Sequence, residues 1–250
     1  MHDILSTEAL KTYFYTPEGT IRAVDRVDVQ IPKGKTVTLC GESGSGKSVT
    51  ALSIMRLVPK PGKIIGGKIV FREVDLLSLS EKEMNNLRGR EISMVFQDPA
   101  LYLNPVVRVG DQIAEGIVSH NILAQKLVKD HVIDLLEGVN LTDPERIYRS
   151  YPHQLSGGMK QRILIAIALS CNPSLLIADE PTTCLDVTIQ RQILLLLKSL
   201  KERRGISLLF ITHDLGIAAE VADIVFVMYA GKIMERAPVF DLFKEPTHPY

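Results

Sequence analysis

The stretch Gly41-Glu42-Ser43-Gly44-Ser45-Gly46-Lys47-Ser48 decides the fold of this 250-residue chain. It fits the pattern G-x-x-x-x-G-K-[ST], in which glycines let successive backbone N–H groups turn inward toward phosphate oxygens. The apolar run Thr36–Cys40 before it predicts a strand, and apolar residues at helical spacing in Val49–Val58 predict a helix after it. A helix start adds its positive end to the same anion site. The sequence therefore predicts a phosphate-binding loop between a strand and a helix.

Within this loop, Lys47 is expected to add a positive charge beside the phosphates and to take part in catalysis, and Ser48 to supply a hydroxyl for magnesium. The residues expected to contact the bound nucleotide here are Gly41, Ser43, Gly44, Ser45, Gly46, Lys47 and Ser48.

A second candidate lies at Leu175–Ala178, an apolar strand that ends in the acidic pair Asp179 and Glu180. In open α/β sheets, ligands bind at such carboxyl ends of strands. Asp179 can hold magnesium through water, and Glu180 can polarise an attacking water. An acidic pair after a strand is by itself equally consistent with a solvated turn, but a phosphate loop in the same chain favours the catalytic interpretation.

The stretch Leu155–Arg162 (LSGGMKQR) places a serine and two glycines before a long apolar helix expected over Ile163–Ser170, a second anion-binding helix start. It resembles the signature motif of the ATP-binding cassette (ABC) family. Further motifs of that family follow the expected order: Val95–Pro99 with Gln97, Thr183–Asp186, and Ile211–Asp214 with His213. The resemblance covers nearly the whole chain.

The resemblance implies an ATPase that requires ATP and Mg²⁺. It implies that Gln97 senses magnesium and the attacking water, that His213 contacts the terminal phosphate, and that Asp186 communicates across a dimer interface. Without it, a lone histidine at a strand end would more often be a surface or satisfied residue, and a loop glutamine would say less still.

The resemblance also implies that two cassettes sandwich two nucleotides. Residues of the signature motif from one subunit would complete the ATP site built on Lys47 of the other, so hydrolysis would require dimerisation. These residues are Ser156, Gly157 and Gly158.

In this family an aromatic residue upstream of the phosphate loop stacks on adenine, and the segment Lys11–Tyr15 offers Tyr13, Phe14 and Tyr15. Tyr13 is the expected choice, although the other two could equally be core residues. Cys184 stands where family members usually carry a small residue such as alanine, a modest change that should leave its loop intact.

The predicted fold class is α/β: an ABC-type nucleotide-binding domain with a RecA-like parallel-sheet core, an antiparallel β subdomain and an inserted helical subdomain. Alternating strands and helices from Leu175 to Met228 support the parallel sheet. One domain over 1–250 is expected, with a core and β subdomain at 1–97 and 155–250. The helical subdomain is expected at 98–154, with the signature motif at its end.

Other elements are expected as follows: a strand in Ile21–Ile31, a connection at Pro59–Gly67, a strand at Lys68–Phe71, a helix capped by Ser80 and Glu83, and helices at Val109–Ile117 and Leu127–Leu136.

The composition excludes several classes of protein. With 29 basic and 29 acidic residues, the chain has no net field to concentrate it on nucleic acid or anionic lipid. The first ten residues lack the pattern of a signal peptide, and no apolar run approaches the roughly 20 residues of a membrane span. The three cysteines, Cys40, Cys171 and Cys184, suit buried positions better than a disulfide framework or zinc site. We expect no direct membrane insertion.

Several segments resemble the importers of dipeptides, oligopeptides and nickel: Gln97–Pro105, Val109–Ile113, Tyr151–Gln154 and His248–Tyr250. That resemblance implies two transmembrane permease subunits, a second homologous ATPase subunit or a second copy of this chain, and an extracytoplasmic solute-binding protein. It places the chain at the cytoplasmic face of the cell membrane. In some members an extension carries an iron–sulfur cluster; any such cluster would lie beyond Tyr250, where this sequence stops, so the sequence neither predicts nor excludes one.

Three alternatives stay open at this point. The cargo could be nickel rather than peptide. A non-transport cassette ATPase acting on nucleic acid or ribosome is opposed by the single cassette, the lack of a long coiled coil and the balanced charge. A phosphate-loop kinase for a small molecule would have no use for the signature motif.

Overall fold

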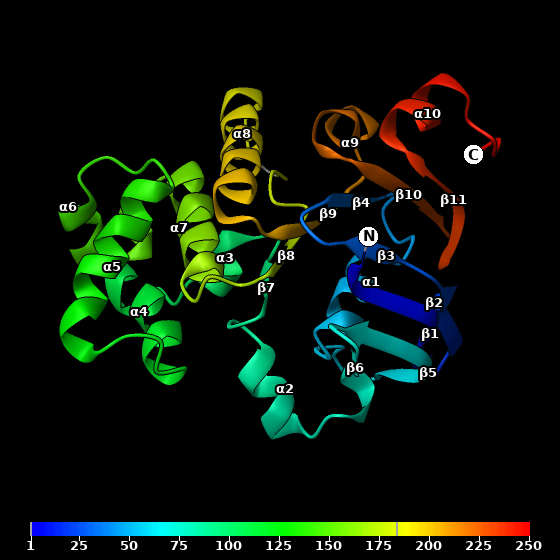
Figure 1. Ribbon diagram of the computed structural model, residues 1–250, viewed down its shortest axis with the longest axis horizontal. Coiled ribbons are helices and arrows are strands. Elements are labelled where there is room, and N and C mark those ends of the chain that lie inside the picture. Colours follow the sequence, from blue (N-terminus) through cyan, green and yellow to red (C-terminus); the bar gives the residue numbers. More distant parts are fainter. Residues whose placement is uncertain (1, 184) are drawn as a thin grey trace. The chain divides into compact units, whose positions relative to one another are not determined.

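The computed structural model describes residues 2–183 and 185–250, which form two compact units (Figure 1). The phosphate-loop unit comprises Met1–Met84 and Ile206–Tyr250, and the helical unit comprises Asn85–Gly205. Residues 85–97 and 155–205 thus group with the helical segment, whereas the sequence-based division assigned them to the core. That division into domains stays a prediction.

The antiparallel sheet of the phosphate-loop unit is built on the long strand β1 (Asp3–Thr16). Its strand order is β2-β1-β5-β6, with β3 also paired to β1. The other strands are β2 (Gly19–Val27), β3 (Gln30–Pro32), β5 (Gly62–Phe71) and β6 (Val74–Asp75).

Two expectations for this sheet were wrong in detail. The single strand expected over Ile21–Ile31 is two strands, because the chain leaves the sheet at Asp28, whose carboxylate accepts the Ala9 N–H at 2.6 Å. The expected connection Pro59–Gly67 is largely strand, because β5 begins at Gly62 and pairs with β1. Glycine-rich sequence predicted a loop, and cross-strand pairing overrode it.

A second group of strands in this unit has the order β11-β10-β4-β9. The neighbours of β4 are parallel to it, and β11 is antiparallel to β10. Every residue of β4 and β9 is buried, which explains their continuous apolar sequence. The bounds are β4 (Thr36–Cys40), β9 (Ser207–Thr212), β10 (Ile224–Tyr229) and β11 (Lys232–Pro238).

This unit contains the helices α1 (Lys47–Ile54), α9 (Leu215–Val221) and α10 (Val239–Lys244). The last two contact each other near β10 and β11 (Figure 1) and share an apolar cluster with the end of β4. Helix α1 ends before the predicted Val58, because Arg56 adopts a left-handed backbone conformation with φ 52°. The short helix α2 (Glu81–Leu87) is capped by reciprocal hydrogen bonds between Ser80 and Glu83, as predicted.

The helical unit contains the parallel pair β7 (Ile92–Val95) and β8 (Leu175–Asp179). Helices α4 and α5 confirm the two predicted in the insert, and α7 begins at Gly157 rather than near Ile163. The helices are α3 (Pro99–Tyr102), α4 (Val109–Ser119), α5 (Gln125–Gly138), α6 (Pro144–Arg149), α7 (Gly157–Leu169) and α8 (Val187–Arg204). Over the described ranges, no helix has both the length and the apolar character needed to span a bilayer.

Candidate functional site

The phosphate loop connects β4 to α1 and depends on glycine at two positions. Gly41 and Gly46 have φ of 154° and 105°. A Cβ atom on Gly41 would lie 2.1 Å from the Met228 carbonyl oxygen, and one on Gly46 would lie 2.1 Å from that of Ala23. Both neighbours are backbone atoms and cannot rotate away. Only glycine therefore fits this loop as it is folded.

Lys47, the first residue of α1, is buried, and its ammonium lies within the loop. The Nζ atom donates to the carbonyl oxygens of Gly41 at 2.8 Å and Glu42 at 2.7 Å. The Ser45 carbonyl accepts the N–H of Gly231 at 2.9 Å, which ties the loop to the turn between β10 and β11. The cation is thus held where loop backbone and helix start converge, the arrangement that binds phosphate.

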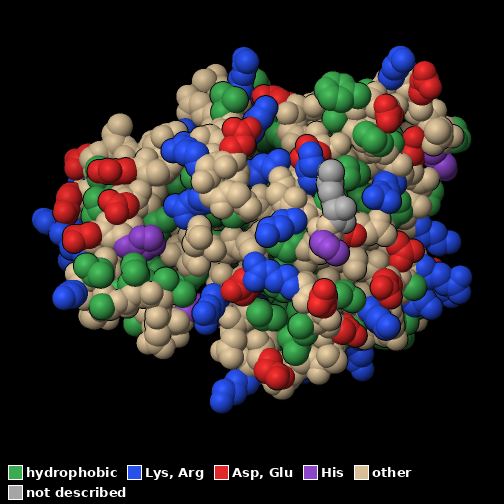
Figure 2. Space-filling view, in the orientation of Figure 1, with side chains coloured by type: hydrophobic (Ala, Val, Ile, Leu, Met, Phe, Trp, Pro, Cys, Tyr) green, Lys and Arg blue, Asp and Glu red, His purple; other side chains and the backbone are tan. Residues whose placement is uncertain are grey.

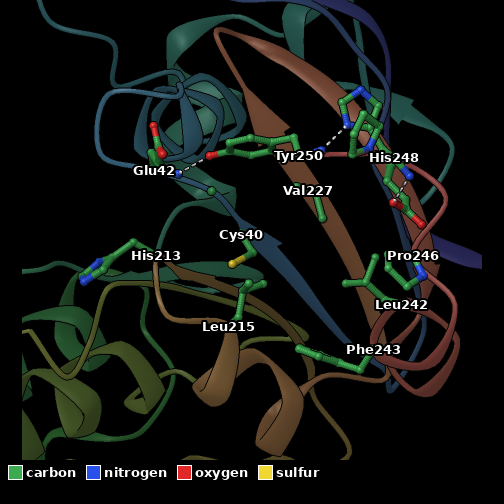
Figure 3. Close-up of a pocket in the computed structure, with 13 residues that line it drawn as sticks. Cys40, Glu42, His213, Leu215, Val227, Leu242, Phe243, Pro246, His248 and Tyr250 are labelled. Carbon is green, nitrogen blue, oxygen red and sulfur yellow. Dashed lines mark hydrogen bonds between the residues drawn. The ribbon is translucent and has the colours of Figure 1, made fainter.

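His213 follows the end of β9, beside the strand that leads into the loop. In the parallel pair β4–β9, Cys40 is aligned with Thr212, so Gly41 and His213 leave the sheet at the same edge. Both line one cavity of this unit (Figure 3). The next residue, Asp214, caps α9 by accepting N–H groups of Gly216 and Ile217, which holds the His213 backbone between strand and helix. Burial raises the pKa of the Cys40 thiol at this edge.

Tyr13 lies on β1, directly across from Arg22 on β2. Its hydroxyl donates to Asp25 Oδ1 at 2.9 Å, and the Arg22 guanidinium lies 5.7 Å from the ring centre. The hydrogen bond to Asp25 raises the pKa of Tyr13. With Lys11, Arg26 and Lys232, these residues line a basic pocket. Figure 2 shows Lys and Arg side chains gathered at the right-hand edge of the view, over β2 and β11. Tyr13 as the adenine-stacking residue stays a prediction.

In the helical unit, the glutamine and the acidic pair come together because β7 and β8 are parallel. Val95 is aligned with Ala178, so Gln97 and Glu180 each stand two residues beyond an aligned pair. Gln97 Nε2 donates to Glu180 Oε2 at 3.3 Å across 83 positions of sequence. Asp179 is buried at the end of β8. The sequence placed the acidic pair at a strand end and Gln97 in a loop, and the structure brings Gln97 and Glu180 into contact.

Thr183 is a residue of this group to which the sequence assigned no role. Its Oγ1 donates to Glu180 Oε2 at 2.9 Å, and its backbone N–H donates to the Glu180 carbonyl at 3.2 Å. Glu180 itself has φ 45°, a left-handed conformation that costs a non-glycine residue about 1 kcal/mol or more. The signal was a hydroxyl three residues after the glutamate, but only a tight turn makes that spacing a contact.

The signature residues precede and begin α7. Ser156 caps the helix by accepting the Met159 N–H at 3.4 Å. A Cβ on Gly158 would lie 2.8 Å from Cγ2 of Ile189 on α8, so this glycine allows two helix starts to pack closely. Asp186 caps α8 by accepting the N–H of the same Ile189 at 3.0 Å. Two motifs that are 30 residues apart in the sequence therefore meet at Ile189, while Cys184 lies outside the described residues.

Each unit thus assembles part of the predicted set. The phosphate-loop unit joins the loop, Lys47 and His213, and the helical unit joins Gln97 with Glu180 and the signature motif with the start of α8. The first set can bind polyphosphate, and the second offers a carboxylate that accepts from Thr183 and Gln97 and could abstract a proton from water.

The chain is similar to known proteins in sequence. The sequence model of the ABC transporter family matches residues 24–183. The chain is 53% identical over its whole length to the oligopeptide transport ATP-binding protein AppD of Bacillus subtilis, of which it covers 76%. It is 49% identical over its whole length to the dipeptide transport ATP-binding protein DppD of the same organism, of which it covers 75%.

Solved structures share the fold across almost the whole chain. The ATP-binding cassette MJ0796, a dimer in a post-hydrolysis state bound to ADP and Pi, has a TM-score of 0.84 at 26% identity, with 94% of this chain and 98% of that chain covered. The structure of cbiO1 from Clostridium perfringens, part of the ABC transporter complex cbiONQ, has a TM-score of 0.83 at 28% identity, with 98% of this chain and 92% of that chain covered. These likenesses confirm the predicted fold class.

Proposed function

This chain belongs to the ABC transporter family as an ATPase domain, and from that premise we propose that it is the ATP-hydrolysing subunit of an importer of dipeptides or oligopeptides. The observation that carries the ATP site is the phosphate loop, with the Lys47 ammonium 2.8 and 2.7 Å from two of its carbonyl oxygens. The peptide class is supported by the names of full-length relatives at about half identity, which include oligopeptide and dipeptide systems.

On the nucleotide side, the loop would bind the phosphates through its N–H groups and through Lys47. When phosphate oxygens enter, the ammonium can exchange its carbonyl partners for them, and an anion is the stronger partner for a buried cation. His213 would contact the terminal phosphate from the same sheet edge. Tyr13 would stack on the base.

Hydrolysis requires a water that is oriented and able to lose a proton. Glu180 would take up this role, because its Oε2 is already oriented by the Thr183 hydroxyl and the Gln97 amide. Phosphoryl transfer leaves the protein mostly positioning and charge stabilisation, so a carboxylate that is oriented in advance loses less entropy when the water binds.

The donor set fits Mg²⁺, which prefers hydroxyl, carboxylate and amide oxygens. Ser48, Asp179 and Gln97 are the proposed ligands. Because the Gln97 amide nitrogen donates to Glu180, its amide oxygen is the atom that would face a cation. When bound with ATP, magnesium supplies charge neutralisation on the phosphates.

We propose that the working form is a dimer of cassettes. Ser156, Gly157 and Gly158 of one subunit would complete the nucleotide site of the other, with Asp186 at the interface. The partner cassette is a homologous subunit or a second copy of this chain. Two permease subunits and a solute-binding protein would complete an importer, with this chain peripheral at the cytoplasmic face of the membrane.

The test is to co-purify the tagged chain from its native membrane in detergent, identify its partners by mass spectrometry, and measure ATP-dependent uptake of labelled di- and tetrapeptides in proteoliposomes of the complex. Recovery of two multi-span permeases with peptide uptake supports the proposal. Uptake of nickel but not of peptides would mean that the cargo is nickel. Recovery of ribosomal or DNA-bound proteins would refute the transport function but not the ATPase activity.

A further inference from the structure

The final five residues, Pro246–Tyr250, form a segment that we call the C-terminal strap. It follows α10 and crosses one side of a cavity of about 510 Å³ in the phosphate-loop unit. Glu42 of the phosphate loop lines the opposite side of the same cavity (Figure 3). The strap thus reaches from the last helix to the nucleotide loop, a contact that the transport function leaves unexplained.

One end of the strap is held by Glu235, a carboxylate on β11 that is only 8% exposed. Its Oε1 accepts the Thr247 N–H and its Oε2 accepts the His248 N–H, each at 2.9 Å. These bonds lower the pKa of Glu235, so the side chain carries its charge at neutral pH. A charged acceptor with both oxygens on successive N–H groups determines the path of the backbone through those two residues.

The other end rests against the loop. The Tyr250 ring packs against Tyr229 at 4.8 Å between centroids, and its backbone N–H donates to His248 Nδ1 at 3.1 Å. The Tyr250 hydroxyl accepts the N–H of Glu42 at 3.3 Å, a contact drawn in Figure 3. The strap is therefore connected from Glu235 to the phosphate loop by hydrogen bonds through Thr247, His248 and Tyr250.

The peptide unit that receives this contact also holds the catalytic lysine. The Glu42 N–H and the Gly41 carbonyl belong to one planar amide, and that carbonyl accepts from Lys47 Nζ at 2.8 Å. A hydroxyl that holds the N–H edge restricts rotation of the whole plane. The same plane sets the direction of the carbonyl that positions the ammonium.

We propose that the C-terminal strap positions the phosphate loop: Tyr250 holds the Gly41–Glu42 peptide plane, and Glu235 holds Tyr250 in reach of it. This inference rests on the proposed nucleotide site. Tyr250 and Glu235 are positioning residues, because they act through the loop: Tyr250 contacts the Glu42 amide, and Glu235 holds the backbone that leads to Tyr250. Their effect falls on binding of ATP rather than on the chemical step.

The test compares the full chain with Tyr250→Phe, which keeps the ring against Tyr229, with Glu235→Gln, and with the matched control Glu245→Gln. Glu245 is 81% exposed at its side chain and pairs only with Lys244 among the ion pairs of the described residues, so it isolates the loss of a carboxylate near the strap. Two quantities are measured: hydrogen exchange of the Glu42 amide without nucleotide, and the separate kcat and KM for ATP.

Losing one hydrogen bond should speed exchange at Glu42 by about 3- to 10-fold and raise KM by about 2- to 5-fold, with kcat within about twofold of wild type. The changes in exchange and KM should be at least as large in Glu235→Gln as in Tyr250→Phe, since the amide nitrogen of glutamine cannot accept the N–H group that the second carboxylate oxygen accepts. Glu245→Gln should match wild type.

The proposal would be overturned if amide exchange at Glu42 and KM for ATP were unchanged in both variants. It would also be overturned if kcat fell by as large a factor as KM rose. If Glu235→Gln unfolds, Tyr250→Phe decides alone. A wild-type chain that binds no ATP would refute the proposed function. Exchange of the Glu42 amide, which is measured without nucleotide, would still test whether the strap holds the loop.

Discussion

The Thr183 hydroxyl offers the sharpest test of how Glu180 is oriented. Thr183→Val replaces the hydroxyl with a methyl group of nearly the same size, so the change removes a donor without opening a cavity. The lost bond is the 2.9 Å contact to Glu180 Oε2. Gln97 remains as a second donor at the longer distance of 3.3 Å.

A hydrogen bond to a charged group contributes about 1.5–3 kcal/mol, and the half-buried position of Thr183 favours the lower end of that range. About 1.4 kcal/mol corresponds to a tenfold change in rate. We therefore expect kcat to fall by about tenfold, while the affinity for ATP stays within about twofold of wild type, because the hydroxyl contacts the carboxylate and not the phosphate loop.

The assay is phosphate release at saturating Mg-ATP, with ATP affinity and thermal unfolding measured on the same preparations. Thr183→Ser is the matched control, since it restores the hydroxyl and should recover most of kcat. In a Glu180→Gln background, Thr183→Val should have little further effect, because the carboxylate it orients is gone. A wild-type kcat in Thr183→Val, or equal losses in the valine and serine variants, would refute the reasoning.

Three further predictions concern the other parts of the site. Glu180→Gln should keep ATP binding, lower turnover by at least about 100-fold because an amide cannot accept a proton from water, and accumulate an ATP-bound dimer in size-exclusion chromatography. Lys47→Ala should weaken ATP affinity by about 10- to 100-fold, measured by nucleotide titration, because a cation beside the phosphates is lost. Gly158→Ala should lower thermal stability by about 1–3 kcal/mol through the 2.8 Å approach to Ile189, whereas Gly157→Ala meets its nearest neighbour at an ordinary 3.9 Å and should be close to neutral.

Each of these has a clear contrary result. Hydrolysis near the wild-type rate in Glu180→Gln would remove that residue from its proposed role. Unchanged ATP affinity in Lys47→Ala would count against the phosphate-loop assignment. Equal stabilities of the two alanine variants would mean that α8 shifts freely to admit the extra methyl group.

The family and its motifs were readable from the sequence because they depend on local chemistry. Glycines at Gly41 and Gly46, a lysine at the helix start and an acidic pair after an apolar run are recognisable within a few residues. The strand Thr36–Cys40 was also predicted at its observed bounds, because all its residues are buried and it reads as an unbroken run of apolar or small residues.

Elements that depend on partners were less readable. The strand β5 contains Gly62, Gly66 and Gly67, and local preference for a turn lost to pairing with β1. Helix α7 extends back to Gly157 because Ser156 caps it, whereas the apolar pattern begins only at Ile163. Strand β11 and helix α10 were not predicted at all.

The sequence by itself determined the reaction class and predicted the residues that would carry it, because phosphate binding and water activation need particular groups at fixed short spacings. Only the tertiary structure decided which residues contact those groups and hold them in place. The Gln97 amide on Glu180, the close packing of Gly158 on Ile189 and the Tyr250 hydroxyl on the Glu42 amide join residues 83, 31 and 208 positions apart. Such contacts are set by strand register and helix packing, which act through space and leave no fixed spacing in the chain.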